Sequence, residues 1–262
     1  MLGFINWDVN PVIFEIGPLA IRYYGLLFAF AFYAAYLIFL RIFKQEKISL
    51  EVLDSLTFYM IIGVVVGARL GHILFYEPAY YFSHPLEILK VWHGGLASHG
   101  ASIGILIALY MFSRKHKRSY LWVLDRIAIV VPLSGAFIRL GNLMNSEIYG
   151  GVTEMPWGFI FVRDGGTVPM HPTQLYEAIC YLAIFGLLWW MYNTGRKINV
   201  PGYFIGLMVT LLFTSRFLVE FVKNVQVDFE STMYLNMGQL LSIPFIVGGL
   251  LTMWWSVKHA KA

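Results

Sequence analysis

The sequence predicts an all-α integral membrane protein with seven transmembrane helices, an external amino terminus, a cytoplasmic carboxyl terminus and a small outer cap. Of its 262 residues, 58% are hydrophobic and only 13% are charged, and the mean hydropathy is +0.66. Soluble domains carry about 25% charged residues, so this composition is typical of a polytopic membrane protein. No soluble domain, low-complexity segment or clear repeat interrupts the chain, which indicates a single membrane domain over residues 1–262.

Seven apolar runs are long enough to cross a bilayer, which takes about 20 residues of helix. Their approximate bounds are 18–41, 53–76, 95–113, 121–144, 173–192, 201–222 and 238–257. The start of the chain has no basic segment followed by a cleavable apolar core, so we expect the first run to be retained. In the second run Gly63, Gly67 and Gly71 are spaced four residues apart, which lets another helix approach closely.

The orientation follows from the loops, because short cytoplasmic loops carry an excess of lysine and arginine. One side has eleven of the nineteen basic residues: Arg41, Lys44, Lys47, Arg114, Lys115, Lys117, Arg118, Arg196, Lys197, Lys258 and Lys261. The loops of the other side contain Lys90, Arg163 and Lys223 beside the acids Glu77, Glu87, Glu154, Asp164, Asp228 and Glu230. The basic side is therefore predicted to be cytoplasmic.

Several classes of site are disfavoured by the residue types present. A single cysteine, Cys180, excludes an internal disulfide framework and a thiolate metal cluster. The histidines at 72, 84, 93, 99 and 171 show no tight metal-ligand spacing with carboxylates, so we expect no metal and no cofactor. The excess of basic residues suits topology and contacts with anionic lipids rather than nucleic-acid binding.

Polar residues inside the predicted spans gather toward their outer ends, where they indicate a polar chamber open to the outer leaflet or the external face. The set comprises Arg22, Tyr24, Arg69, His72, His99, Arg139, Asn142, His171, Gln174, Glu177, Arg216, Glu220 and Gln239. Ionisable groups within a membrane are costly, so they mark a candidate functional site.

Three arginines of this set could bind a phosphate group, because a guanidinium offers parallel donors and keeps its charge when dehydrated. Each also has a structural alternative. Arg139 could cap neighbouring carbonyls or extend to the headgroups, and Arg69 could bond to carbonyls beside the glycine face. Arg216 could form an i,i+4 ion pair with Glu220.

His99 is the candidate proton acceptor. It lies between Gly95 and Gly100, and such glycines let a backbone or a substrate approach the imidazole closely. Histidine titrates near neutrality, which suits a general base, but the ring could equally only orient lipid or helix. The outer segment 145–172 could be a cap over the chamber or a solvated connector.

A series of motifs follows in order along the chain: Asp8–Phe14, Ile16–Pro18, Arg22–Gly25, Gly67–Gly71 with Tyr76, Trp92–Gly100, Arg139–Glu147 with Gly150, His171–Glu177, Arg216–Glu220 and Met237–Pro244. In these motifs the chain resembles the bacterial prolipoprotein diacylglyceryl transferases over nearly its whole length. The chain departs from the family pattern at Ala101, at Leu212, where a tyrosine is expected, and at Lys223, where an arginine is expected.

The resemblance implies transfer of a diacylglyceryl group from phosphatidylglycerol to the lipobox cysteine thiol of a prolipoprotein, with release of glycerol phosphate. It implies a multi-pass protein of the bacterial plasma (inner) membrane, with its active site toward the outer leaflet and in contact with membrane lipids. The implied catalytic residues are His99, Arg139 and Arg216. The implied substrate-binding residues are Tyr24, Arg69, Gly95, Gly100, Asn142, Asn145, Glu147, Gly150 and Glu220.

Two other functions compete with this interpretation. One is a transporter of an anionic organophosphate or lipid, although transporters usually place their site at the midplane between two related halves. The other is a lipid-binding assembly partner that performs no chemistry. An increase in the mass of a lipobox peptide after incubation with phosphatidylglycerol distinguishes the enzyme from both.

Overall fold

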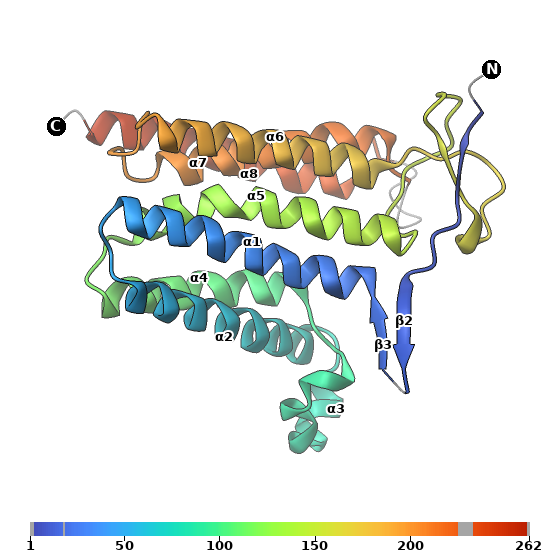
Figure 1. The fold of residues 1–262 in the computed structure, drawn as a ribbon, viewed down its shortest axis with the longest axis horizontal. Helices are drawn as coiled ribbons and strands as arrows, with labels where there is room; N and C mark the ends of the chain where they lie inside the picture. Colours follow the sequence, from blue (N-terminus) through green and yellow to red (C-terminus); the bar gives the residue numbers. More distant parts are fainter. Residues whose placement is uncertain (1–2, 18, 225–232, 261–262) are drawn as a thin grey trace. The chain divides into compact units, whose positions relative to one another are not determined.

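The protein is a mainly helical, multi-pass membrane protein. A computed structural model describes residues 3–17, 19–224 and 233–260, so Asp228, Glu230 and Lys261 lie outside the described residues. The chain divides into two compact units: unit 1 comprises Met1–Ala35 and Asp125–Ala262, and unit 2 comprises Tyr36–Leu124. Figure 1 shows the elements of both units.

A helix occupies each of the seven apolar runs. The helices are α1 (Tyr23–Gln45), α2 (Leu50–Phe75), α4 (Ser98–Lys115), α5 (Tyr120–Met144), α6 (Thr173–Asn193), α7 (Tyr203–Val219) and α8 (Met237–His259). Six of them are long and apolar enough to cross a membrane. The exception is α4, whose ends carry His99, Arg114 and Lys115 and so dilute its apolar centre.

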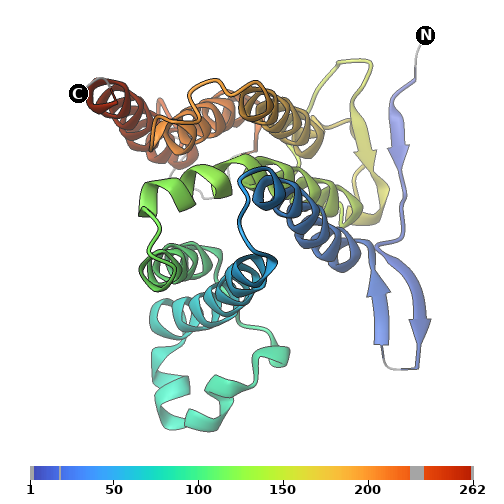
Figure 2. The ribbon, with the colours of Figure 1, turned by 60° about the vertical axis from the view of Figure 1, so that its left-hand side comes forward.

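In unit 2, α2 and α4 lie side by side (Figures 1 and 2). A Cβ atom added to Gly67 would lie 2.5 Å from the Gly100 carbonyl oxygen, and one added to Gly104 would lie 2.2 Å from that of Gly63. No side chain fits at these positions, so the glycine face predicted in α2 is the surface on which α4 packs. The α2–α4 connection holds α3 (Pro78–Ser83), η1 (Pro85–Leu89) and η2 (Val91–His93).

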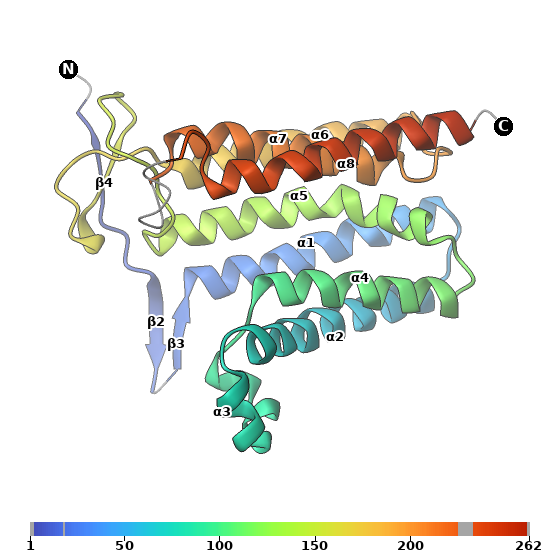
Figure 3. The same ribbon diagram turned by 180° about the vertical axis from the view of Figure 1, so that it is seen from behind.

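Unit 1 contains α6, α7 and α8 in sequential contact, together with most of α5 and the first part of α1. The start of α7 is held by Asp125 of α5, whose carboxylate accepts hydrogen bonds from the backbone N–H groups of Gly202 (2.7 Å) and Ile205 (3.0 Å). A helix start leaves its first N–H groups without helical partners, and the buried carboxylate fills that role. Figure 3 shows these helices from behind.

Short strands, which the sequence analysis did not predict, complete unit 1. Residues Leu19–Arg22 form β3, antiparallel to β2 (Val12–Ile16), so α1 begins later than the first apolar run (Figure 2). β1 (Ile5–Trp7) pairs in parallel with β4 (Phe159–Phe161), which is followed by η3 (Val162–Asp164).

The segment that follows α5 has a small apolar core of its own. Phe159 and Phe161 are buried with Leu143 of α5, and Trp7 packs against them and donates a hydrogen bond to the Leu143 carbonyl (2.9 Å). Burial of several large side chains stabilises a segment that is mostly irregular in backbone. The residues after α5 are thereby folded onto the end of that helix.

Candidate functional site

The centre of the site is a buried carboxylate between two cations. Glu177, in the second turn of α6, is fully buried and lies 2.6 Å from Nε of Arg139 in α5. Its other oxygen lies 3.1 Å from Nζ of Lys223, which follows η4 (Glu220–Val222) at the end of α7. A buried charge is tolerated only with close partners of opposite sign, so each of the three groups depends on the others.

The network continues from Lys223 into α7 and α8. Nζ of Lys223 is also 3.3 Å from the Glu220 carboxylate, which lies 3.8 Å from Nε of Arg216. Asn236, at the start of α8, donates to the same carboxylate (3.3 Å), and its side chain also forms a capping box with Gln239. The predicted Arg216–Glu220 pair is therefore present, but it is long, and the Arg216 side chain remains 39% exposed.

A second arm leads from Arg139 to the end of α5. Nη1 of Arg139 donates to Oδ1 of Asn142 (3.1 Å), and Nδ2 of Asn142 donates to Glu147 (2.8 Å). Asn145 donates to the same Glu147 oxygen (3.3 Å). Glu147 thus reaches Arg139 through Asn142, whereas the carboxylate in direct contact with Arg139 is Glu177.

The chain reversal after α5 explains the position of Glu147. The N–H of Glu147 bonds to the Asn142 carbonyl and that of Ser146 to the Leu143 carbonyl, with Ser146 at a φ of 56°. This is a Schellman ending, in which a left-handed residue terminates the helix. It turns Glu147 back toward α5, and Gln174 of α6 holds the turn by donating to the Glu147 carbonyl (2.7 Å).

Tyr24 and Gly150 border the network on the same unit. Tyr24 packs on Gly141 of α5, where an added Cβ would lie 2.8 Å from the tyrosine ring, and its hydroxyl is within the electrostatic influence of Glu147 and Arg139. An added Cβ at Gly150 would lie 2.3 Å from the Val222 carbonyl oxygen. Only glycine fits there, so Gly150 brings the outer segment against the end of α7.

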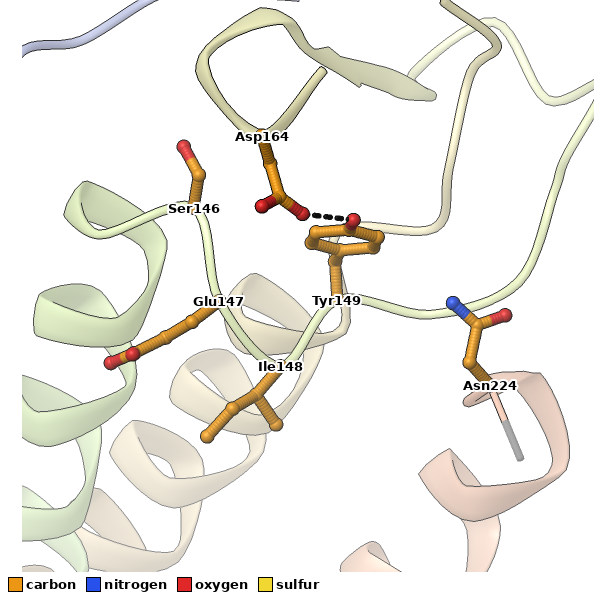
Figure 4. A pocket seen from close by; sticks show the side chains of 6 residues that line it. All are labelled: Ser146, Glu147, Ile148, Tyr149, Asp164 and Asn224. Atoms are coloured by element: carbon orange, nitrogen blue, oxygen red, sulfur yellow. Dashed lines mark hydrogen bonds between the residues drawn. The ribbon is translucent and has the colours of Figure 1, made fainter. Parts of the chain in front are cut away.

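A cavity of about 400 Å³ opens beside this end of α5, lined by Ser146, Glu147, Ile148, Tyr149, Asp164 and Asn224. Figure 4 shows Glu147 extending toward α5 and Asp164 reaching the Tyr149 hydroxyl, which donates a hydrogen bond to it. That hydrogen bond, and then burial, raise the pKa of Tyr149, so the phenol stays protonated. The arginines predicted to share a chamber do not line this cavity.

In unit 2 the Arg69 guanidinium is enclosed by backbone carbonyls. It donates to the carbonyls of Ile88 (3.0 Å), Gly94 (2.6 Å) and Gly95 (3.2 Å), and also to that of Glu87, and its side chain lies over the Tyr81 ring. This is the carbonyl-bonding alternative to substrate contact. Its effect is to hold the α2–α4 connection against α2.

The other predicted site residues of unit 2 lie in the first turn of α4 (His99 and Gly100) or just before it (Gly95). His99 is exposed and packs edge-on against Phe75, with ring centroids 5.2 Å apart, and lies at a tilt of 37° to the Tyr76 ring at 5.7 Å. Gly95 has a φ of 69° and faces His72 and Arg69, whereas Gly100 is buried in the α2–α4 contact. Gly100 thus has a packing role that the sequence analysis did not assign to it.

Glu177 was predicted as one of the polar residues of the chamber but was given no catalytic or substrate-binding role, and Lys223 and Asn236 were not among the predicted site residues. Glu177 carried a usable signal, because an acid inside a span requires a partner, and three arginines were available. Lys223 was counted as a loop residue, since it follows the last apolar residue of its run. Its burial depends on η4 turning the chain back over Glu177, which a hydropathy pattern does not encode.

Comparison with known proteins gives the family. The model of the family described as prolipoprotein diacylglyceryl transferase matches residues 11–255. A phosphatidylglycerol–prolipoprotein diacylglyceryl transferase of Tolumonas auensis is 47% identical over 254 residues, covering 97% of this chain and 98% of the relative. Proteins of the same name from Chloroherpeton thalassium (47% over 263 residues; 99% and 97%) and Bacteroides fragilis (46% over 266 residues; 97% and 96%) are similar over comparable lengths. The chain therefore belongs to the prolipoprotein diacylglyceryl transferase family.

Proposed function

We propose that this protein transfers the diacylglyceryl group of phosphatidylglycerol to the lipobox cysteine of a prolipoprotein. The observation that carries the proposal, beside the family, is the joining of Arg139 and Arg216 into one network by Glu177, Lys223 and Glu220. A phosphodiester headgroup placed at this network meets guanidinium groups held in position before it arrives. Such preorganised charge stabilises the negative charge that develops on a leaving phosphate.

The nucleophile in this reaction belongs to the substrate. The cysteine sulfur attacks the glyceryl carbon of the diacylglyceryl group, a C–S bond forms, and the C–O bond to phosphate breaks. The thiol proton passes to a base, and glycerol phosphate leaves as a phosphate monoester stabilised by Arg139 and Arg216. A free thiol with a pKa of about 8.5 is only a few per cent thiolate at pH 7, so its deprotonation matters.

Residues around the arginines would position the lipid. Asn142, Asn145 and Tyr24 orient either the glycerol headgroup or Arg139, and Glu147 fixes the two asparagines. Glu220 holds Arg216, and Gly150 lets the outer segment approach. Arg69, Gly95 and Gly100 support the α2–α4 connection that presents His99, the proposed base; the alternative is that His99 orients lipid while arginine charge lowers the thiol pKa.

We place the protein in the bacterial plasma (inner) membrane, with seven spans, an external amino terminus, a cytoplasmic carboxyl terminus and the site toward the outer leaflet. The charge network joins the C-terminal ends of α5 and α7 to the N-terminal ends of α6 and α8, as one membrane face requires. The lysine-rich and arginine-rich loops follow the opposite ends of these helices, which supports this orientation.

The decisive experiment incubates the purified protein with phosphatidylglycerol vesicles and a lipobox peptide, and measures the peptide mass. Addition of one diacylglyceryl group, with release of glycerol phosphate, is the expected result. Arg139→Ala should abolish the mass shift while the protein still accumulates in membranes. Lipid binding or lipid movement across the vesicle without a modified peptide would contradict the transferase and favour the binding or transport alternatives.

The role of His99 has its own test. If His99 is the base, His99→Gln should lower the rate and remove the rise of rate with pH that reports its deprotonation. A variant with the parental rate and the parental pH–rate profile would eliminate the histidine as base.

A further inference from the structure

The cavity beside the end of α5 has an excess of hydrogen-bond acceptors. Among the described residues that line it, Glu147 and Asp164 are acids, and Tyr149 already donates its hydroxyl proton to Asp164. The cations that adjoin these residues in sequence are paired elsewhere: Arg163 lies 3.1 Å from Asp8, and Lys223 is bound to Glu177 and Glu220. The cavity therefore favours a ligand that brings N–H donors and positive charge.

A second observation is that this cavity is lined by a residue whose buried hydroxyl has no hydrogen-bond partner in the described structure. Ser146 is 6% exposed, lines the cavity, and its Oγ has no hydrogen-bond partner in the described structure. A buried hydroxyl without a partner costs about 1–3 kcal/mol, so such groups in folded proteins are satisfied by water or by a ligand. Among the described residues no group of three or more His, Cys, Asp or Glu side chains could hold a metal ion. A peptide N–H or an amino group is the complementary ligand.

The cavity is also tied to the charge network by a short rigid path. Glu147 is common to both, because its carboxylate accepts from Asn142, which in turn accepts from Arg139. The loop that carries Ser146 and Glu147 is fixed to α6 by Gln174, which bonds to the Glu147 carbonyl, and by Thr173, which bonds to the Ile148 carbonyl (2.9 Å). A ligand in this cavity would adjoin the proposed reaction centre without entering it.

We propose that this cavity binds the polypeptide immediately following the reacting cysteine of the precursor, and that it selects for basic and against acidic residues there. The inference rests on the proposed function, which supplies a peptide acceptor. The cysteine of a prolipoprotein has the apolar signal segment on its amino side and the mature chain on its carboxyl side. A cavity walled mainly by polar side chains, beyond the last residue of a membrane-spanning helix, suits the second of these.

The test uses three lipobox peptides that are identical through the cysteine and carry lysine, glutamine or glutamate at the next three positions. The full-length protein in phosphatidylglycerol micelles should give a kcat/KM for the lysine peptide about three- to tenfold above that for the glutamate peptide, as expected for partly exposed charges. Asp164→Asn removes one charge and keeps an oxygen for Tyr149, so it should compress this ratio toward one. Glu154→Gln, an exposed acid of the same outer segment outside the cavity, should leave the ratio unchanged.

The ratio is independent of how much enzyme folds, so a purely structural effect of Asp164→Asn would lower all three rates together and overturn the proposal. Equal transfer to all three peptides by the parent protein would overturn it as well, while leaving the transferase function intact. Absence of transfer to any peptide would instead contradict the proposed function. A ratio that responds to added salt and to Asp164→Asn but not to Glu154→Gln supports the cavity as the binding site.

Discussion

At the scale of single residues, the site depends on Glu177 more than on any one cation. Its two carboxylate oxygens serve different cations from different helices, Arg139 of α5 and Lys223 after α7. An arginine held this way has its guanidinium plane fixed before a phosphate arrives. In the proposed mechanism the Glu177 carboxylate positions Arg139, and Arg139 makes the contact with the substrate phosphate.

Glu177→Gln keeps the shape of the side chain and removes its charge. Arg139 loses the carboxylate in direct contact with it, and Lys223 keeps Glu220 but loses Glu177. We therefore expect the free energy of unfolding to fall by about 3–5 kcal/mol and transfer to fall more than tenfold, about 1.4 kcal/mol in the barrier. Thermal unfolding in detergent and the peptide mass assay measure the two effects. Glu154→Gln serves as the exposed control, and a parental melting temperature for Glu177→Gln would show that the buried pairs contribute little.

His116, in the loop after α4, should make unit 2 sensitive to acid. Burial, and then the charges of Lys115 and Arg118, lower the pKa of His116 below its usual 6.5. The folded state therefore binds fewer protons than the unfolded chain, so stability is complete above about pH 6.5 and is lost as pH falls through the lowered pKa. The neutral ring accepts or donates a hydrogen bond at Ser55 (2.8 Å) and packs on Phe112.

The corresponding variant is His116→Asn, which cannot titrate. We expect the melting temperature of the parent protein to fall between pH 7 and pH 5, and that of the variant to fall less over the same interval. The change of melting temperature with pH is compared, and not the melting temperature itself, because the variant also loses the contact with Phe112. If parent and variant show the same change, His116 has the same proton affinity in the folded and unfolded states.

At the scale of elements, the contact between α2 and α4 depends on the absence of side chains. Gly63, Gly67 and Gly71 face Gly100 and Gly104 so closely that a Cβ atom added to any of them would clash with the facing helix. Membrane helices associate by close packing because lipid provides no hydrophobic drive between them. The backbone approach is therefore the main stabilising feature of this helix pair.

Gly104→Ala should separate the two helices, because its Cβ would lie 2.2 Å from the Gly63 carbonyl oxygen. We expect a lower melting temperature and, because His99 lies in the first turn of α4, lower transfer as well. Gly186→Ala is the matched control in α6, where an added Cβ meets nothing within 4 Å and alanine favours helix by about 1 kcal/mol. Equal effects of the two substitutions would contradict the packing argument.

The start of α7 depends on Asp125. Asp125→Ala would leave the buried N–H group of Gly202 and the partly buried N–H group of Ile205 without their acceptor, and the buried one alone costs about 1–3 kcal/mol. A fall in melting temperature and faster hydrogen exchange at the beginning of α7 are the expected results. Asp54→Ala removes an exposed acid from the first turns of α2 and should change neither measurement.

At the scale of the whole molecule, sequence analysis predicted the family, the enzyme class and the helical membrane architecture, and these are confirmed. Apolar runs encode helices locally, which is why the helix bounds lie near the predicted ones. Residues 5–7 pair with residues 159–161, which are far away in the sequence, so no local sequence pattern predicts this pairing. The contact between Glu177 and Lys223 was not predicted for the same reason.

The proposed orientation can be tested with the chain's single cysteine removed. In a Cys180→Ala background, a cysteine placed at Glu154 should react with a membrane-impermeant maleimide in intact cells, whereas one placed at Lys117 should react only after permeabilisation. The prediction follows from the opposite membrane faces assigned to the two loops. Labelling of Lys117→Cys in sealed cells would reverse the assigned topology.

The charge network has one further consequence, for turnover. In the described part of unit 1 it joins three cationic side chains, Arg139, Arg216 and Lys223, with three anionic ones, Glu147, Glu177 and Glu220. The resting network is electrically balanced, so in the proposed reaction a phosphate competes with Glu177 and Glu220 for the guanidinium groups of Arg139 and Arg216. Phosphatidylglycerol brings one negative charge, and the departing glycerol phosphate carries up to two. When the glycerol phosphate escapes to water, the two carboxylates bind their arginines again and the resting network is restored.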